Sequence, residues 1–287
     1  MRVDDIHSAH EAGSVDAFRQ SWRALDASER YHFSRRDPQT QVQFAFQNHW
    51  RVFRSLMEPI RGGRALEVGC GRGSMAAFFS DAGFETHLLD TSTTALEIAR
   101  KNFSLDGLKG LPVAGNALAL PYSDEVFDAT VSIGLLEHFA EIEQPLAEQL
   151  RVLRSGGVFL GYVVPERVLS VQCLAWPINA FLRLRQTVRG RKGVMGGKSP
   201  LFRNGLRSDD FIAVLKRRGV SRAGAFGMFP VPLISHSPSF PFSANDPHVE
   251  RTIIRVWERL LRRRRRAADP WICPELWGLA FLVWAYK

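Results

Sequence analysis

Apolar and polar positions in the middle of the chain follow two alternating patterns. Short apolar runs, typical of buried strands, occupy residues 64–68, 86–89, 111–113, 129–133 and 157–164. Between them, apolar residues recur at helical spacing over 74–82, 94–103 and 143–154, which predicts amphipathic helices. Strands that are apolar throughout and alternate with helices favour a parallel sheet covered on both faces.

The rest of the sequence flanks or interrupts this alternation. Further elements are predicted as helices over 15–27, 42–60, 208–218 and 249–266, and as strands over 221–229 and 279–286. We therefore expect an α/β domain over residues 62–287, preceded by a helical N-terminal cap over 1–61. Residues 166–207 and 230–276 do not fit the alternation and are interpreted as two insertions.

The first predicted strand ends in a glycine-rich turn. The sequence there reads LEVGCGRG over residues 66–73. Glycines at alternate positions allow a sharp bend and a close approach to a ligand, and the next helix presents unpaired N–H groups. A nicotinamide-dinucleotide site needs the spacing GxGxxG, but Ser74 stands where its third glycine would be. Glu67 would repel a pyrophosphate and suits a ligand that carries positive charge.

Two polar residues at later strand ends add a nucleoside pattern. Asp90 ends the second strand, where a carboxylate can accept hydrogen bonds from both hydroxyls of a ribose. Asn116 follows the third strand, where its amide would read an adenine edge. Together with the glycine turn, these positions predict a ligand built from a ribose, a base and a cationic group.

These residues resemble the class I S-adenosylmethionine-dependent methyltransferases, in particular their small-molecule branch. The resemblance covers residues 64–165 tightly, and residues 208–220 and the last strand more loosely. It is carried by the segments LEVGCGRG (66–73), LDTS (89–92), GNA (115–117), FD (127–128) and LRSGG (153–157). Several ordered motifs at the family's separations are far more specific than one glycine cluster.

The resemblance implies a fold, a cofactor and a set of site residues. The fold would be a Rossmann-like, seven-stranded, mostly parallel sheet whose last strand is antiparallel, and the cofactor would be S-adenosyl-L-methionine. The residues implied to bind it are Glu67, Gly69, Cys70, Gly71 and Gly73 at the methionine end, Asp90 at the ribose, Thr91, Asn116 and Ala117 at the adenine, and Gly134 with Leu135 on the sulfonium side. The family usually has an acidic residue where Asn116 stands, which is a mild departure because an amide oxygen can also accept a hydrogen bond from the adenine amine.

The implied activity is methyl transfer to a small or lipid-like acceptor, and one form of this hypothesis has an anionic acceptor. Oxygen is slightly favoured over nitrogen as the methylated atom. A protonated acceptor needs a base, and His138 at the mouth of the fourth strand is the candidate. The other interpretation of His138 is helix capping or packing. Two alternative functions stay open, namely a non-catalytic protein that binds the cofactor and a nicotinamide-dependent oxidoreductase.

The excess of positive charge is concentrated in one segment. The 287 residues include 38 Lys and Arg against 29 Asp and Glu, a net charge of +9. Nine of the basic residues and no acidic one lie in 167–207, so this segment should attract anions or lipid headgroups to one place. It is interpreted as a solvated loop or as a lid over the acceptor, with peripheral membrane contact as one hypothesis.

Other partners are disfavoured by what the sequence lacks. No nucleic-acid-binding motif is recognisable, and five consecutive arginines over 262–266 are interpreted as a solvated helix end. Three widely spaced cysteines fit neither a disulfide framework nor a metal site, so no metal is expected. Without a secretory signal or an apolar run long enough to span a bilayer, we expect a cytoplasmic location, peripheral at the membrane in one version. The sequence leaves the oligomeric state open.

Overall fold

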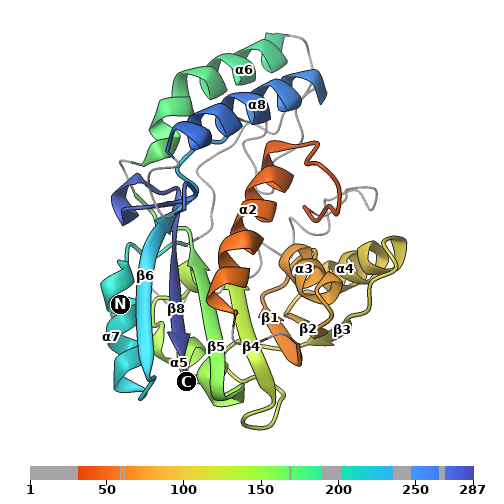
Figure 1. Ribbon diagram of the computed structural model, residues 1–287, viewed down its shortest axis with the longest axis vertical. Helices are drawn as coiled ribbons and strands as arrows, with labels where there is room; N and C mark the ends of the chain where they lie inside the picture. Colours follow the sequence, from red (N-terminus) through yellow and green to blue (C-terminus); the bar gives the residue numbers. More distant parts are fainter. Residues whose placement is uncertain are drawn as a thin grey trace, which may run out of the picture.

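The structure, a computed structural model, describes residues 32–58, 60, 62–167, 170–188, 202–234, 247–264 and 269–287. Within these residues, one eight-stranded sheet has the order β3-β2-β1-β4-β5-β8-β6-β7 (Figure 1). Its strands are β1 (Arg64–Val68), β2 (Glu85–Asp90), β3 (Leu111–Ala114), β4 (Phe127–Ile133), β5 (Leu153–Val163), β6 (Arg222–Met228), β7 (Ile272–Cys273) and β8 (Ala280–Tyr286). The predicted helix over 15–27 lies outside the described residues.

The described helices connect and cover these strands. The α-helices are α2 (Gln41–Leu56), α3 (Ser74–Asp81), α4 (Thr93–Leu105), α5 (Glu143–Val152), α6 (Trp176–Val188), α7 (Ser208–Arg217) and α8 (Pro247–Arg263). Short 3-10 helices are η1 (Leu136–His138), η2 (Val171–Ala175) and η3 (Glu275–Trp277). None of the helices in the described part of the chain has both the length and the apolar character that crossing a membrane requires.

The direction of the strands confirms a mostly parallel sheet whose last strand is antiparallel. Strands β3, β2, β1, β4 and β5 pair in parallel, and β8 pairs antiparallel with both β5 and β6. The prediction of seven strands was wrong, because β7 adds an eighth through Gly227↔Cys273 and Met228↔Ile272. A strand of two residues is too short to produce a recognisable alternation, and it lies in the segment interpreted as an insertion.

Both faces of the sheet are covered, as the apolar strands predict. Along β5, Val158 and Leu160 pack in one core with residues of α2, α3, α4 and α8. Phe159 and Val163 point the other way, into a second core built with α5 and α7. This alternation places the helical layers on opposite sides of the parallel strands.

Two predicted boundaries moved. The predicted helix over 143–154 ends at Val152, and β5 begins at Leu153 rather than at residue 157, because Leu153 already pairs with Phe127 across an irregular register. The predicted helix over 42–60 ends at Leu56, where the N–H of Met57 donates to the carbonyl oxygens of Phe53 and Arg54. Both shifts arise from backbone pairing that hydrophobic spacing does not reveal.

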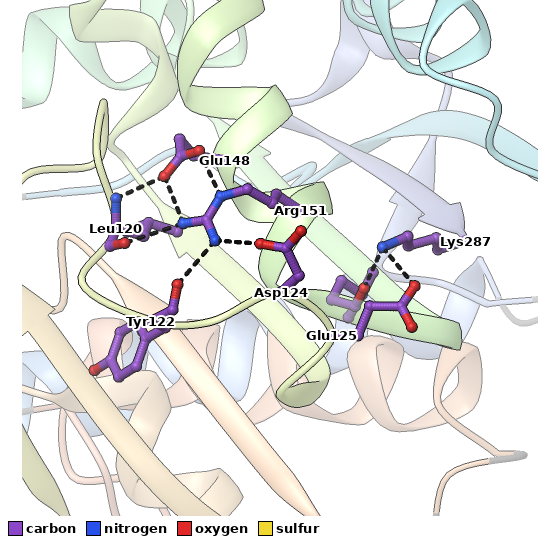
Figure 2. A network of polar contacts seen from close by, with 8 residues as sticks. Leu120, Tyr122, Asp124, Glu125, Glu148, Arg151 and Lys287 are labelled. Atoms are coloured by element: carbon purple, nitrogen blue, oxygen red, sulfur yellow. Dashed lines mark hydrogen bonds and ion pairs between the residues drawn. The ribbon is translucent and has the colours of Figure 1, made fainter.

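Arg151 on α5 fixes the connection between β3 and β4 (Figure 2). Its guanidinium donates to the carbonyl oxygens of Leu120 (3.0 Å) and Tyr122 (2.8 Å) and to carboxylate oxygens of Asp124 (2.7 Å) and Glu148 (2.7 and 2.8 Å). Glu148 in turn accepts from the backbone N–H of Leu120 at 2.7 Å. One side chain therefore holds a whole loop against a helix.

We expect Arg151→Met to destabilise the protein by about 1 to 3 kcal/mol, because it leaves two backbone carbonyls and two carboxylates without their shared donor. Urea unfolding followed by circular dichroism measures this loss. Arg218→Met is the matched control, since it removes only an exposed ion pair with Glu143 (2.9 Å) and should cost less than about 1 kcal/mol. Equal effects of the two substitutions would contradict the assigned role of Arg151.

Candidate functional site

The predicted site residues follow the carboxyl ends of four neighbouring strands, β3, β2, β1 and β4. The register pairs Val68 with Leu89, and Asp90 with Ala114, so the turns after β1, β2 and β3 meet at one edge. Chain order reverses between β1 and β4, and in open α/β sheets ligands bind outside such a switch point. The fold alone therefore brings the glycine turn, Asp90, Asn116 and Gly134 to the place where this architecture binds ligands.

The glycine turn is held to β2 by backbone hydrogen bonds. The N–H groups of Gly69 and Cys70 both donate to the carbonyl oxygen of Leu89, at 2.8 and 2.9 Å. Gly69, Gly71 and Gly73 have φ values of 70°, 50° and 76°, in the left-handed region that favours glycine. The bend therefore requires these residue types, as the sequence predicted.

Two of these glycines are also required by close packing. A Cβ at Gly69 would lie 2.9 Å from Cδ1 of Leu135, so the end of β4 rests directly on the turn. A Cβ at Gly73 would lie 2.8 Å from Cδ2 of Leu88 and 3.0 Å from Cε2 of Phe103. Gly73 thus faces the core beside α4, and the absence of a side chain there allows α4 to pack closely against β2.

Glu67 is a buried carboxylate beneath the turn. It is 4% exposed, and its Oε2 accepts from the N–H of Ala76 in α3 at 2.7 Å. Burial raises the pKa of Glu67 to about 8, and the nearby Asp90 adds to the rise against the opposing hydrogen bond. A positively charged ligand group beside it would lower that pKa again, since it stabilises the ionised form.

Asp90 ties the turn to the start of α4. Its Oδ2 accepts from the N–H of Gly71 and its Oδ1 from the N–H of Ser92, both at 2.9 Å. Burial raises the pKa of Asp90 while these backbone donors oppose the rise. Because each carboxylate oxygen has two acceptor positions, both oxygens can still accept a hydrogen bond from a ribose hydroxyl.

The residues predicted at the adenine lie at the same edge. Thr91 and Asn116 are exposed, while Ala117 is buried. The Oδ1 of Asn116, the atom predicted to accept from adenine, accepts from the N–H of Leu118 at 3.0 Å. That oxygen keeps a second acceptor position. The side chain of Cys70, also predicted at the cofactor, is buried, and burial raises the pKa of its thiol well above the usual value.

The end of β4 carries Gly134, Leu135, Glu137 and His138. Gly134 has φ 65° and donates to the carbonyl oxygen of Tyr162 at 2.9 Å. His138 is half-buried, and its Nδ1 lies 2.6 Å from the carbonyl oxygen of Phe202, to which it donates. Burial lowers the pKa of His138 to about 4, although its hydrogen bonds to the carbonyls of Phe202 and Gly134 oppose this. The ring is therefore neutral at pH 7 and connects two chain segments.

Glu137 was not predicted from the sequence as a site residue. It is 1% exposed, and its Oε2 has no hydrogen-bond partner among the described residues. Burial raises its pKa to about 7, against the field of Arg203 and a hydrogen bond from the backbone of Val164. A Cβ at Gly134 would lie 3.6 Å from its Oε1. An acidic residue beside the candidate histidine was the only signal in the sequence.

Asn204 was also missed, and it joins the end of the basic segment to the site. Its N–H donates to the carbonyl oxygen of Glu137 (2.7 Å), and its Nδ2 donates to those of Leu136 (3.0 Å) and Phe139 (2.8 Å). The chain therefore returns from the basic segment directly onto the turn after β4. The position of Asn204 depends on long-range contacts, which have no local sequence pattern.

These residues fit an adenosyl ligand with a cationic centre. Asp90 offers acceptors for a ribose, Glu67 offers a buried carboxyl that a neighbouring cation would ionise, and positive-φ glycines keep side chains away from the bend. Within the described ranges, no group of His, Cys, Asp or Glu could hold a metal ion. The arrangement can therefore bind and orient a charged nucleoside, with Glu137 and His138 in η1 after the neighbouring strand β4.

Comparisons with known proteins agree with this geometry. Residues 66–161 match the family described as a methyltransferase domain. A ubiquinone/menaquinone biosynthesis C-methyltransferase from Bartonella bacilliformis is 29% identical over 172 residues, which cover 57% of this chain and 66% of that protein. A fatty-acid O-methyltransferase from Mycolicibacterium smegmatis is 34% identical over 117 residues, 37% of this chain and 41% of that protein. The matches thus span less than two thirds of these relatives.

A solved structure from Thermotoga maritima, an S-adenosylmethionine-dependent methyltransferase, shares the fold. Its TM-score is 0.50 at 18% identity, and the match covers 85% of this chain and 90% of that one. Both the family match and the fold coincide with the part of the sheet that carries the glycine turn and Asp90. Residues 66–161 therefore correspond to the domain of an S-adenosylmethionine-dependent methyltransferase of class I.

Proposed function

We propose that the protein transfers the methyl group of S-adenosylmethionine to a small, lipid-like acceptor. The observation that carries this proposal is the meeting of Glu67, the glycine turn and Asp90 beside Gly134 at the switch point of the sheet. The bound cofactor would supply a methyl group on a sulfonium, which is already activated toward a nucleophile. What remains for the protein is to hold and orient the two reactants, which can contribute about 7 to 11 kcal/mol to catalysis.

Each residue has a defined part in this proposal. Asp90 would bind the ribose, Thr91, Asn116 and Ala117 the adenine, and Glu67 with the glycine turn the charged end of the methionine. Gly134 and Leu135 would border the sulfonium. These assignments extend the observed geometry to a bound cofactor and stay predictions.

The class of the acceptor is supported by the relatives. Their printed names include a quinone-biosynthesis C-methyltransferase, a squalene methyltransferase and a fatty-acid O-methyltransferase. All three act on long apolar molecules or their precursors, so we propose an acceptor with a long apolar part. We predict that the methylated atom is oxygen rather than nitrogen. Carbon is tested as well, because one of these relatives is named a C-methyltransferase.

The function is tested with radiolabelled S-adenosylmethionine and a panel of acceptors. We expect transfer of the radiolabelled methyl group to fatty acids, phenolic lipids or isoprenoid phenols. Mass spectrometry of the product identifies oxygen as the acceptor atom when a methoxy group is lost on fragmentation. Small hydrophilic amines serve as the matched negative set. Cofactor binding without transfer to any acceptor would instead favour the alternative of a non-catalytic binding protein.

Asp90→Ala should weaken binding of S-adenosylhomocysteine by about 1 to 3 kcal/mol, since it removes ribose acceptors and releases the N–H of Gly71. Isothermal titration calorimetry measures the change. Glu97→Ala, an exposed acidic residue on α4, is the control and should leave the affinity unaltered. An unchanged affinity in Asp90→Ala would reject the assignment to the ribose.

Two residues compete for the role of base, and pH distinguishes them. If the carboxylate of Glu137 removes the proton, kcat/KM should rise with pH through about 7, because the carboxyl is ionised above its raised pKa. If His138 removes it, the rate should be flat above pH 5, because its lowered pKa of about 4 leaves it unprotonated throughout.

We expect the rise through pH 7, because Glu137 has an oxygen without a partner whereas His138 is hydrogen-bonded to backbone. Glu137→Gln should abolish the rise and lower kcat while affinity for S-adenosylhomocysteine is kept. His138→Gln is the companion variant and should keep the pH profile. A Glu137→Gln enzyme with wild-type rate and profile would rule out the carboxylate and return the role to His138.

A further inference from the structure

Helix α6 presents its apolar side chains to solvent. Leu174 before it and Trp176, Phe181 and Leu184 on it are between 63% and 71% exposed, and Ile178 is 47% exposed. In a helix that covers a core, such residues face inward. Five large apolar side chains over eleven residues form an exposed patch of the kind that marks an interaction site.

The inward side of this segment is held by polar contacts instead. Nδ2 of Asn179 donates to the carbonyl oxygen of Leu233 at 3.1 Å, and Asn179 is only 8% exposed. Gln172 pairs with the backbone of the same residue, donating to its carbonyl (2.8 Å) and accepting from its N–H (3.1 Å). The outward direction of the apolar face is therefore fixed by specific hydrogen bonds.

Helix α8 is anchored to the same loop and is basic on its exposed side. Glu250, buried on α8, accepts from the N–H of Gln41 at 2.8 Å, and Gln41 also accepts from the N–H of Ile234 at 2.9 Å. The exposed arginines of α8 are Arg251, Arg255, Arg259, Arg262 and Arg263. Figure 1 shows α6 and α8 together at the top of the molecule, beyond the end of the sheet where β4 and β5 finish.

We infer that α6 is a membrane-docking surface and that its partner is an anionic lipid bilayer. An interfacial helix of this kind combines Trp, Phe and Leu on one side with nearby basic residues, and binds through apolar burial plus attraction to anionic headgroups. Arg185 on α6 is exposed, and the segment 167–207 contains no acidic residue. A second copy of the chain would bring these like-charged surfaces together, which disfavours it as the partner.

The inference rests on the proposed function in one respect, because the membrane would be the source of a lipid-like acceptor. The chain segment that connects the sheet edge with α6 is short. The backbone of Val164, the residue after β5, donates a hydrogen bond to Glu137, and η2 and α6 follow from Val171 onward. A helix docked on lipid would place the carboxyl edge of the sheet toward the membrane, where an apolar acceptor is concentrated.

The test is co-sedimentation of the full chain with vesicles of phosphatidylglycerol and phosphatidylcholine, and with phosphatidylcholine alone. We expect binding to the anionic vesicles that weakens with added salt. The double variant Phe181→Ser with Leu184→Gln should bind at least about tenfold more weakly, because two large apolar side chains no longer enter the lipid. Arg255→Gln and Arg259→Gln should each weaken binding by about fivefold.

Trp277→Ser is the matched control. Trp277 is as exposed as Trp176, at 70%, but lies on η3, so its replacement should leave vesicle binding unchanged. Binding that survives the α6 substitutions, or equal loss in Trp277→Ser, would overturn the inference. So would equal binding to uncharged vesicles, or a dimer seen by light scattering that only the α6 substitutions dissociate.

Affinity for S-adenosylhomocysteine is measured on every variant. It should stay at the wild-type value in the α6 and α8 variants, which shows that they are folded and that the cofactor site is independent of the docking surface. Loss of vesicle binding with intact cofactor affinity supports docking by α6. Absence of cofactor binding in the wild type would reject the proposed function and leave the result on vesicles standing.

Discussion

The site depends on one carboxylate, that of Asp90, whose two oxygens both accept hydrogen bonds from backbone N–H groups. Its Oδ2 accepts from the N–H of Gly71 and its Oδ1 from that of Ser92, so a single side chain joins the turn after β1 to the first turn of α4. Gly71 lies in the positive-φ bend and has no side chain to pack, so the carboxylate adds to the backbone hydrogen bonds that hold the turn to β2. The same carboxylate is the proposed ribose acceptor, which means that the element that shapes the bend also reads the ligand.

Two further carboxyls are buried at a free-energy cost that the fold alone does not offset. Glu67 receives one hydrogen bond at the observed geometry, and Glu137 keeps an oxygen without a partner in the described residues. Burial raises the pKa of both groups to near or above neutrality. A cationic ligand group beside either carboxyl would offset part of this cost, because it stabilises the ionised form. Glu67 lies on β1 and Glu137 follows the neighbouring strand β4, which is consistent with a site shaped for positive charge.

The sequence predicted the parallel sheet and the residues at its carboxyl edge because both are local. The glycine turn LEVGCGRG needs no distant contact to be recognised, and the alternation of apolar strands with helices is enough to predict a parallel sheet. What it did not predict depends on tertiary pairing. Strand β7 is only two residues long. Asn204 takes its role from hydrogen bonds to a turn 65 residues away in the sequence. The raised pKa of Glu137 results from its burial. Helix α6 lies in the basic segment that was interpreted as a loop or a lid, and the direction of its apolar face is set by hydrogen bonds of Asn179 and Gln172.

The two parts of the molecule therefore follow different physical rules. At the sheet, apolar side chains are buried on both faces and polar groups are reserved for the strand ends. At α6 the arrangement is reversed, with polar anchors inside and apolar residues outside. Five large apolar side chains on η2 and α6 are exposed and add nothing to the core, and exposed patches of this kind mark interaction sites. The lipid surface that we propose as the partner of α6 would also present the lipid-like acceptor of the proposed function.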